Sequence, residues 1–209
     1  DLDHMVAPLQ RHTTHYLSVN KKDGGKGIYS QKDAYLGFDA LYTRDTDLTL
    51  FTFHADCCPV LLYCENQHLI AAIHSGWKGT YKQIASKTVK KMKQELSIKP
   101  ENLICCMCPS IRKCHFEVKQ DVKDLFEEEF KNKTDISRLI KKQPYKEGTD
   151  EKWNIDTIEL NKAMLIKEGL KPENIIDSKI CTVCNSDQLH SYRVEKEKLG
   201  LETAIIALK

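Results

Sequence analysis

The sequence predicts an α/β fold in a single domain over residues 1–209. Of its 209 residues, 41% are hydrophobic and 30% charged, which is enough for one substantial core. Short β-rich runs alternate with longer segments whose apolar residues recur at helical spacing. A helix, the letters KPEN and a strand follow one another twice, with the letters at 99–102 and 171–174. This echo indicates a duplicated β-α-β element, although a recurring helix-exit turn would give the same letters.

In the first half of the chain, residues 48–53 (LTLFTF) predict a strand. The runs 59–63 and 69–73 predict a hairpin that turns near residues 65–67. A helix is expected over about residues 80–96, ending before Pro100, because the residue before a proline disfavours helical geometry. One face of this helix carries an apolar stripe: Tyr81, Ile84, Ala85, Val89, Met92 and Leu96. Residues 103–107 resume as a strand.

The second half continues the alternation. Residues 120–130 predict an acidic amphipathic helix, and residues 131–150 predict a long, charged surface excursion. A second helix over about residues 157–168 ends at Gly169, a favourable residue just beyond a helix end. The last segment, 202–208 (ETAIIAL), predicts a core strand.

Net charge and hydropathy exclude some partners. A formal charge of +2 is too small to indicate nucleic acid or an anionic membrane surface as a partner. No segment approaches the roughly twenty apolar residues of a membrane span, and no secretory leader is visible. Because the chain begins at Asp1 and not at Met, a missing N-terminal segment stays open.

The nine cysteines are odd in number and scattered through apolar runs, which favours reduced thiols in the cytoplasm over a disulfide framework. Cys105 with Cys108, and Cys181 with Cys184, form two CxxC pairs that invite a zinc-ribbon interpretation. The pairs are more than seventy residues apart, whereas ribbon knuckles are about 15–20 apart. We therefore interpret these cysteines as buried or partly buried residues.

Two histidines and one cysteine elsewhere in the sequence are more informative about a metal site. His74 lies in AAIHSGWKGT (71–80), and Cys57 lies seventeen residues upstream in FHADCCPVLLY (53–63). His12, in LQRHTTH (9–15), would complete a set of two histidines and one cysteine. Zinc favours such ligands, and three protein ligands leave the fourth tetrahedral position open for water or substrate.

Several motifs together resemble one known family. They are QRH (10–12), FDALYT (38–43), ADCCPVLL (55–62), HSGWKGT (74–80), PSIRKCHFEV (109–118), WNIDTIELNKAMLIKEG (153–169) and SDQLHSYR (186–193). The chain resembles the YfiH-like laccase-domain family, whose members carry the label multicopper polyphenol oxidoreductase. That family is also understood as zinc-dependent purine nucleoside phosphorylases that deaminate adenosine. The resemblance implies a four-layer α/β/β/α sandwich built from duplicated units, in agreement with the echo described above.

The resemblance also implies site residues. The zinc ligands fall on His12, Cys57 and His74, and His12 is preferred over His15 because Gln10 precedes it at Q-x-H spacing. His15 and His54 are neighbours of the ligands and not ligands themselves.

The expected chemistry follows from these parts. Zinc lowers the pKa of bound water, and the resulting hydroxide can attack C6 of adenine, as in other zinc deaminases. Phosphorolysis also needs an anion pocket, for which Lys78 and Arg193 are the expected phosphate partners. Asp56 is expected to accept a proton or to orient a ligand histidine, or else to form a buried turn.

The remaining polar and aromatic residues of the motifs have weaker signals. Gln10, Trp77 and Ser110 are the expected substrate contacts, with a core position as the alternative for Trp77. His115 and Glu117 fall on one face of a strand-like run that meets either substrate or solvent.

The sequence departs from the family pattern in several places. Cys108 stands where a glycine is usual, Lys78 stands where an arginine is usual, and Leu201 replaces the arginine that usually follows Gly200. The Gly-rich segment near the N-terminus is absent. These changes concern anion binding most, since lysine cannot supply the bidentate fork of arginine.

Two other classes of function stay open. A copper-dependent polyphenol oxidoreductase (laccase) would need a many-histidine copper cluster, which eight mostly scattered histidines do not suggest. A Cys–His hydrolase or peptidoglycan-related editing factor would use Cys57 as a nucleophile and not as a ligand. The leading expectation is an enzyme acting on purine nucleosides and phosphate, with no nucleic-acid or membrane partner and an open oligomeric state.

Overall fold

A six-stranded sheet lies at the centre of the computed structural model, which describes residues 1–144 and 147–209. In spatial order its strands are β13 (Ile175–Asp177), β9 (Ile104–Met107), β7 (Cys58–Cys64), β8 (Leu69–Ser75), β5 (Ala40–Thr43) and β3 (Tyr16–Ser18). The β9–β7, β7–β8 and β8–β5 pairs are antiparallel, whereas β13 and β3 join the two edges in parallel. The predicted hairpin is confirmed: β7 and β8 turn at the 3-10 segment η3 (Glu65–Gln67).

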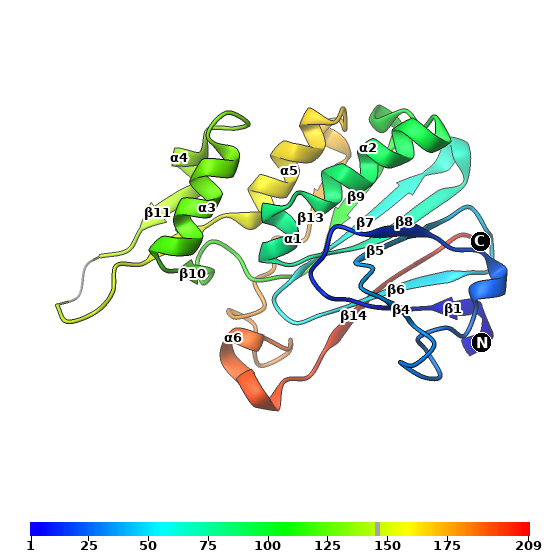
Figure 1. Ribbon diagram of the computed structural model, residues 1–209, viewed down its shortest axis with the longest axis horizontal. Helices are drawn as coiled ribbons and strands as arrows, with labels where there is room; N and C mark the ends of the chain where they lie inside the picture. Colours follow the sequence, from blue (N-terminus) through cyan, green and yellow to red (C-terminus); the bar gives the residue numbers. More distant parts are fainter. Residues whose placement is uncertain (145–146) are drawn as a thin grey trace.

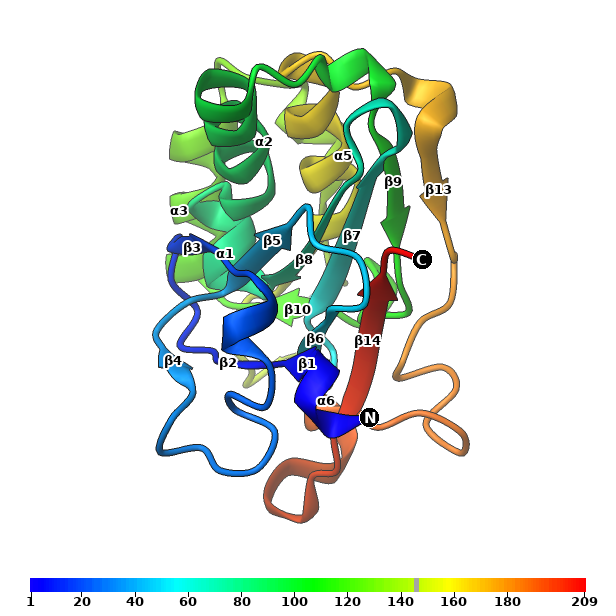
Figure 2. The same ribbon diagram turned by 90° about the vertical axis from the view of Figure 1, so that its right-hand side faces the viewer.

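A second sheet stacks on one face of the first. It consists of β1 (Met5–Val6), β6 (Thr49–His54) and β14 (Glu202–Ala207), in the order β1-β6-β14. Helices α1 (Trp77–Tyr81), α2 (Ile84–Leu96) and α5 (Thr157–Lys167) cover the opposite face (Figure 1, Figure 2). The predicted α/β class is confirmed, and so are the strand predictions that became β6 and β9. The prediction of a core strand at the C-terminal end is confirmed as to the strand, but β14 lies at a sheet edge and Ile205 is 55% exposed.

Strand β8 is buried along its whole length, because one face meets the helices and the other meets the second sheet. Ala71 and Ile73 belong to the helix-side core, whereas Ile70 and Ala72 belong to the core between the sheets. Side chains alternate along a strand, so His74 faces the second sheet and Ser75 faces the helices. A strand buried on both faces explains why this part of the sequence is an unbroken apolar run.

The predicted helix over residues 80–96 is two helices. Gln83 has a left-handed φ of 62°, which α1 cannot continue through, and α2 starts at the next residue. The Gln83 side chain donates a hydrogen bond of 2.5 Å to Glu129, so a distant residue holds the break. The buried residues Ile84, Val89 and Met92 do form the predicted stripe of α2.

The KPEN repeat is a structural repeat. Helix α2 leads through η4 (Pro100–Asn102) into β9, and α5 leads through η5 (Pro172–Asn174) into β13. The two helices pack together, the two strands pair in parallel, and Asn174 Nδ2 donates to Glu101 O across the two turns. The CxxC pairs extend beyond these strands, since β9 ends at Met107, before Cys108, and β13 ends at Asp177, before Cys181.

A third sheet lies beside the helices. Strands β10 (Glu117–Val118), β12 (Trp153–Ile155) and β11 (Ile140–Lys142) form it in that order. Helix α3 (Gln120–Phe130) has the predicted bounds and packs on it through Phe126 and Phe130. The predicted surface excursion over 131–150 is wrong in part, because α4 (Ile136–Leu139) and β11 form within it. Their apolar residues pack against the same hydrophobic cluster as Phe126 and Phe130. Residues 145–146 of that range lie outside the described residues.

Short elements complete the chain. They are η1 (Leu2–His4), β2 (Pro8–Leu9), η2 (Lys21–Asp23), β4 (Tyr35–Leu36), α6 (Tyr192–Glu195) and η6 (Lys196–Lys198), with β2 and β4 paired in parallel. Among the described residues, none of the helices has the length and apolar character needed to cross a membrane.

Candidate metal centre and active site

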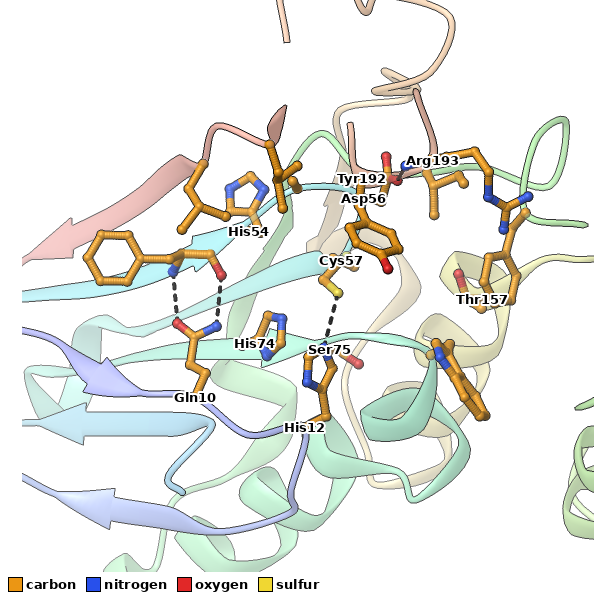
Figure 3. Close-up of a pocket in the computed structure, with 18 of the residues that line it drawn as sticks. Gln10, His12, His54, Asp56, Cys57, His74, Ser75, Thr157, Tyr192 and Arg193 are labelled. Atoms are coloured by element: carbon orange, nitrogen blue, oxygen red, sulfur yellow. Dashed lines mark hydrogen bonds between the residues drawn. The ribbon is translucent and has the colours of Figure 1, made fainter. Parts of the chain in front are cut away.

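The three predicted ligands meet at one end of the two stacked sheets. His12 follows β2, Cys57 directly precedes β7, and His74 lies near the end of β8. Their ligand atoms all lie within 4.8 Å of one another. All three residues line one cavity of about 780 Å³, and Figure 3 shows the Cys57 sulfur directed toward the two imidazoles. The fold therefore brings three residues that are far apart in the sequence to one place.

A buried carboxylate orients His74. Its Nδ1 atom lies 2.8 Å from Oδ1 of Asp39, which is 1% exposed. A carboxylate accepts hydrogen bonds, so Nδ1 carries the proton and Nε2 is the nitrogen that can bind a metal. Burial raises the pKa of Asp39, but the bond from His74 and two backbone N–H groups lower it to about 2. Asp39 thus stays ionised beside the site.

The same carboxylate fixes the segment that carries His12. The backbone N–H groups of Arg11, His12 and Thr13 donate to Asp39 at 2.8–3.1 Å. His12 has a left-handed φ of 57°, a conformation that costs free energy in a non-glycine residue. The three hydrogen bonds offset that cost and hold the His12 ring edge-on to the His74 ring, with 4.9 Å between ring centroids.

Cys57 is activated by its two histidine neighbours. Its Sγ lies 3.7 Å from His12 Nε2. Burial raises the pKa of Cys57, but His12 and His74 outweigh burial and lower it to about 7. Burial lowers the pKa of His74, but Asp39 and Cys57 raise it to about 9. The thiolate form, which is the metal ligand, is therefore accessible at neutral pH.

Gly76 leaves room for these side chains. A Cβ atom at this position would lie 2.8 Å from Cys57 Sγ and 2.8 Å from His12 Cδ2. Real Cβ atoms do not approach other atoms so closely, so a larger residue would displace a ligand side chain. The glycine in HSGW is thus required by the packing of the site.

The donor set fits a tetrahedral metal with one open position. In a zinc site with Zn–S of about 2.3 Å and Zn–N of about 2.0–2.1 Å, sulfur and nitrogen are about 3.6 Å apart. The distance between Cys57 Sγ and His12 Nε2 is 3.7 Å. Two imidazoles and one thiolate suit zinc or another borderline-soft divalent cation, and all three residues line the cavity.

Asp56 connects the metal ligands to the C-terminal part of the chain. Its carboxylate accepts hydrogen bonds from Thr182 Oγ1 at 2.6 Å, Ser191 Oγ at 2.7 Å and the Arg193 backbone N–H at 2.7 Å. It is 9% exposed and has a left-handed φ of 77°. Three donors hold this carboxylate in place, and the carboxylate that orients a ligand histidine is Asp39 and not Asp56.

The two predicted phosphate partners have different positions. Arg193 lines the cavity, and its guanidinium donates to the backbone oxygens of His115 and Glu117 at 2.9 and 3.1 Å. Lys78 is exposed on α1, with Nζ 5.5 Å from the centroid of the Trp77 ring. Among the described residues that line the cavity, Arg193 is the only lysine or arginine.

The residues predicted to contact substrate also differ in their positions relative to the cavity. Trp77 lines the cavity and is partly buried. Gln10 lines it as well, but its amide donates to Phe53 O at 2.7 Å and accepts from Phe53 N at 2.8 Å, so the amide is engaged by β6. Ser110 is fully buried and offers no surface to a substrate, whereas its neighbour Ile111 lines the cavity.

The cavity has mostly apolar walls. They include Leu9, Phe53, Ile111, Phe116, Val118, Leu199 and Leu201, with Tyr192 at the exposed rim. Leu201 is the residue that replaces the expected arginine, so this departure places an apolar group at the cavity.

His54 is buried beside the cavity, and burial lowers its pKa to about 4, which keeps the ring neutral. Its Nδ1 atom is 3.5 Å from Glu202 Oε2, and within the described part of the chain neither atom has a hydrogen-bond partner.

Sequence reasoning missed Asp39, His54 and Tyr192 as parts of the site. Asp39 had a signal, because a carboxylate in a strand-like apolar run must be paired when buried. The sequence predicts His54 only as a neighbour of the metal ligands, and it assigns no role to Tyr192. His15, the other excluded histidine, is exposed and lies 3.2 Å from Gly37 O.

Known proteins are similar to this chain in sequence and in fold. Residues 1–209 match the family model described as multi-copper polyphenol oxidoreductase laccase. A purine nucleoside phosphorylase of Bacteroides thetaiotaomicron is 32% identical over 204 residues, which cover 98% of this chain and 72% of that protein. The purine nucleoside phosphorylase YlmD of Staphylococcus aureus is 32% identical over 206 residues, covering 99% and 73% of the two chains.

Solved structures agree. The YfiH protein of Bacillus licheniformis matches with a TM-score of 0.91 at 27% identity, over 100% of this chain and 76% of that chain. YlmD of Geobacillus stearothermophilus matches with a TM-score of 0.89 at 26% identity, over 100% and 74%. The chain therefore belongs to the family described as multi-copper polyphenol oxidoreductase laccase, to which the YfiH-like fold and the predicted resemblance both point.

Proposed function

We propose that this protein is a zinc-dependent purine nucleoside phosphorylase with adenosine deaminase activity. Its substrates would be inosine, adenosine, guanosine or methylthioadenosine together with phosphate, and its products the free base and (deoxy)ribose 1-phosphate. The observation that carries the proposal is the set of His12, Cys57 and His74, whose open side faces a largely apolar cavity. The names of the relatives, purine nucleoside phosphorylases, support the same activity.

The cavity has the size and walls that a nucleoside needs. Its volume of about 780 Å³ lies within the roughly 300–1,000 Å³ range of small-molecule sites. Trp77 and Tyr192 offer aromatic surfaces to a purine ring. The neutral His54 imidazole adds a polar side chain to the lining of the cavity.

The reaction needs a place for phosphate beside the sugar. Phosphorolysis breaks the bond from C1′ to the base nitrogen and forms a bond from C1′ to a phosphate oxygen. The Arg193 guanidinium is the cation suited to bind that phosphate, and the carbonyls of His115 and Glu117 fix its orientation. Asp56 positions the Arg193 backbone, whereas Lys78 is exposed on α1 and does not line the cavity.

Bound by His12, Cys57 and His74, zinc would supply Lewis-acid chemistry with one open coordination position. The protein's own contribution is to lower the pKa of Cys57 to about 7, to present Nε2 of His74 through Asp39, and to surround the reacting groups with apolar walls. Low local dielectric strengthens each of these electrostatic contacts.

The test is incubation of purified protein with adenosine and phosphate, with and without a chelator, followed by chromatography of the products. We expect adenine and ribose 1-phosphate from phosphorolysis of adenosine, inosine from deamination, hypoxanthine from phosphorolysis of that inosine, and none of these after metal removal. Phosphate omission should abolish base release but leave inosine formation. Absence of both product sets from metal-loaded protein would refute the proposal.

One observation favours a second candidate, a Cys–His hydrolase. The Cys57 sulfur lies 3.7 Å from His12 Nε2, and its pKa is lowered to about 7, which also suits a nucleophile. Thiol alkylation separates the two roles, because a metal ligand is protected by bound zinc whereas a free nucleophile reacts in the zinc-loaded protein.

The family's description as multi-copper polyphenol oxidoreductases names copper chemistry instead. A laccase needs a trinuclear cluster with many histidines, whereas the group of His12, Cys57 and His74 contains two. Copper in the purified protein together with a blue absorption band would support that activity.

All nine cysteines are free thiols, which supports a reducing compartment such as the cytoplasm.

A further inference from the structure

Four potential metal ligands gather at a second place, away from the nucleoside cavity's own ligands. Cys114 and His115 lie in the loop between β9 and β10, and Cys181 and Cys184 lie in the segment that follows β13. Their ligand atoms all lie within 4.8 Å of one another. The sequence prediction that Cys181 and Cys184 are only buried or partly buried residues is thereby corrected. They meet Cys114 and His115, and not the other CxxC pair, because β9 and β13 bring the two loops together.

The distances fit a tetrahedron. Cys114 Sγ lies 3.6 Å from Cys181 Sγ and 3.8 Å from Cys184 Sγ. His115 Nδ1 lies 3.7 Å from Cys181 Sγ and 3.4 Å from Cys184 Sγ. Around zinc, two sulfurs are about 3.8 Å apart, and a sulfur and a nitrogen are about 3.6 Å apart. Four separate contacts therefore match the edges of one coordination shell.

The cysteines of this group are not disulfide-bonded. A disulfide has an S–S distance of about 2.05 Å, far shorter than the contacts of Cys114 with Cys181 and Cys184. All three are free thiols, and three thiols cannot all be satisfied by one disulfide. A shared cation satisfies all of them at once.

The backbone holds the ligands in place without a metal. Cys181 forms a bridge with Ser110, and its carbonyl accepts hydrogen bonds from Asn185 N and Asn185 Nδ2. Burial raises the pKa of Cys181, but backbone N–H groups of Cys184 and Arg112 lower it to about 7. The Arg112 side chain binds Asp177 through two hydrogen bonds of 2.7 and 2.8 Å and so joins the two loops.

We propose that Cys114, His115, Cys181 and Cys184 form a second metal site, which binds zinc in a closed tetrahedral shell. Four protein ligands leave no position for substrate, so the role of this site is structural. The group differs from the His12–Cys57–His74 site both in its ligand count and in its position in the chain. The inference stands whether or not the protein acts on purine nucleosides.

The second site supports one wall of the cavity. The carbonyl of His115 accepts a hydrogen bond from the Arg193 guanidinium, and Thr182, between the two cysteines, donates to Asp56. Both contacts lead to residues of the proposed active site. Zinc at this place would fasten the C-terminal segment to the loop before β10 and thereby fix Arg193.

Metal content tests the proposal. Protein reconstituted with zinc and freed of excess metal should contain two equivalents in the wild type and one in Cys184→Ser. One equivalent should remain in Cys57→Ala and none in the double variant. Cys106→Ser, a partly buried cysteine outside both groups, is the matched control and should keep two. Two equivalents in Cys184→Ser, or none in Cys57→Ala, would overturn the proposal.

A second measurement uses the unmodified chain, in case Cys184→Ser does not fold. Cys114 and Cys184 are exposed, so in a metal-free protein they should react rapidly with a thiol reagent. With zinc bound they should be protected until a chelator is added, as peptide mass spectrometry can show. Fast modification of both in zinc-loaded protein, or a native disulfide between Cys114 and Cys181, would contradict the site.

Cobalt gives an independent signature in the Cys57→Ala variant. Substitution by cobalt at a site with three thiolates should give intense sulfur-to-metal absorption in the near ultraviolet, which Cys184→Ser should reduce. Lack of that absorption in cobalt-loaded Cys57→Ala would also count against the proposal.

Discussion

Asp39 Oδ1 lies 2.8 Å from His74 Nδ1, and this contact determines how the candidate metal site is built. The same carboxylate accepts hydrogen bonds from the segment that carries His12. One buried acid therefore orients two of the three ligands, although it touches no metal position itself. The loss of Asp39 should affect metal affinity more than it affects the fold.

The first prediction is that Asp39→Asn weakens zinc binding at the open site by roughly 10- to 100-fold, a typical loss for a partner that orients a ligand. An amide neither holds the Nδ1 proton as strongly nor accepts as many backbone hydrogen bonds. Competition titration with a chelator of known affinity measures the change. Asp124→Asn, on the exposed side of α3, is the control, and equal affinities in both variants would contradict this role.

Gly76→Ala should remove metal from the open site and leave the second site loaded. The added methyl would lie 2.8 Å from Cys57 Sγ and His12 Cδ2, and overpacking of this kind costs about 1–3 kcal/mol. Metal analysis and thermal unfolding measure both effects. Gly148→Ala is the control for metal content, because nothing lies within 4 Å of its Cβ position; its φ of 78° strains an alanine, so it is no control for thermal unfolding. Full metal content in Gly76→Ala would show that the close approach is tolerated.

Alkylation of Cys57 in metal-free protein should have its midpoint near pH 7. His12 and His74 outweigh burial and lower the pKa of Cys57 to about 7, so the reactive thiolate prevails above that pH. Rates followed by mass spectrometry from pH 5 to 10 give the midpoint. In His12→Ala the midpoint should move up, and in zinc-loaded protein the reaction should nearly stop. An ordinary thiol midpoint in the wild type would contradict the arrangement.

Asp56→Asn should keep both metals but lower kcat/KM by roughly 10- to 100-fold. An amide cannot accept all three hydrogen bonds, and each bond to a charged acceptor contributes about 1.5–3 kcal/mol. The expected cause is displacement of Arg193 and not loss of a base, so the pH profile of kcat/KM should keep its shape. Loss of an ionisation from that profile would instead make Asp56 a proton acceptor.

The free energy of unfolding should fall in acid, because the stabilising charge of Asp177 is lost there. Arg112 and Lys162 hold the pKa of Asp177 well below its ordinary value despite burial. A depressed pKa in the folded state stabilises the fold above the unfolded pKa of about 3.9, and the stabilisation is lost as pH falls below it. Asp177→Asn should cost about 3 kcal/mol at pH 7 and less at pH 3, by urea unfolding. Asp187→Asn, which is exposed, should unfold as the wild type does at both pH values.

Much of the fold could be predicted because its signals are local. The β7–β8 hairpin, α3 and the end of α5 at Gly169 follow from apolar spacing and from residues with special backbone geometry. The break at Gln83 could not be predicted, since Glu129 holds it from another helix. Strand β11 was missed for the same reason, because its partner β12 lies beyond the intervening loop.

The site shows a similar division. His12, Cys57 and His74 stand in motifs that resemble those of one family, and this resemblance, more than their spacing, predicted that they lie together. The partners that tune them were not predicted, because Asp39 and the segment around Ser191 reach the site only through sheet pairing and long-range hydrogen bonds. Cys114 and His115 were missed as partners of Cys181 because residues some 66–70 positions apart share no sequence pattern.

The central claim is that the metal held by His12, Cys57 and His74 enables phosphate-dependent cleavage of purine nucleosides. It is tested most directly by measuring metal content and phosphate-dependent base release in the same samples of wild type and Cys57→Ala. The account predicts that the variant stays folded, loses one metal equivalent and releases no base from inosine. Undiminished base release by a Cys57→Ala protein that lacks that equivalent would contradict it.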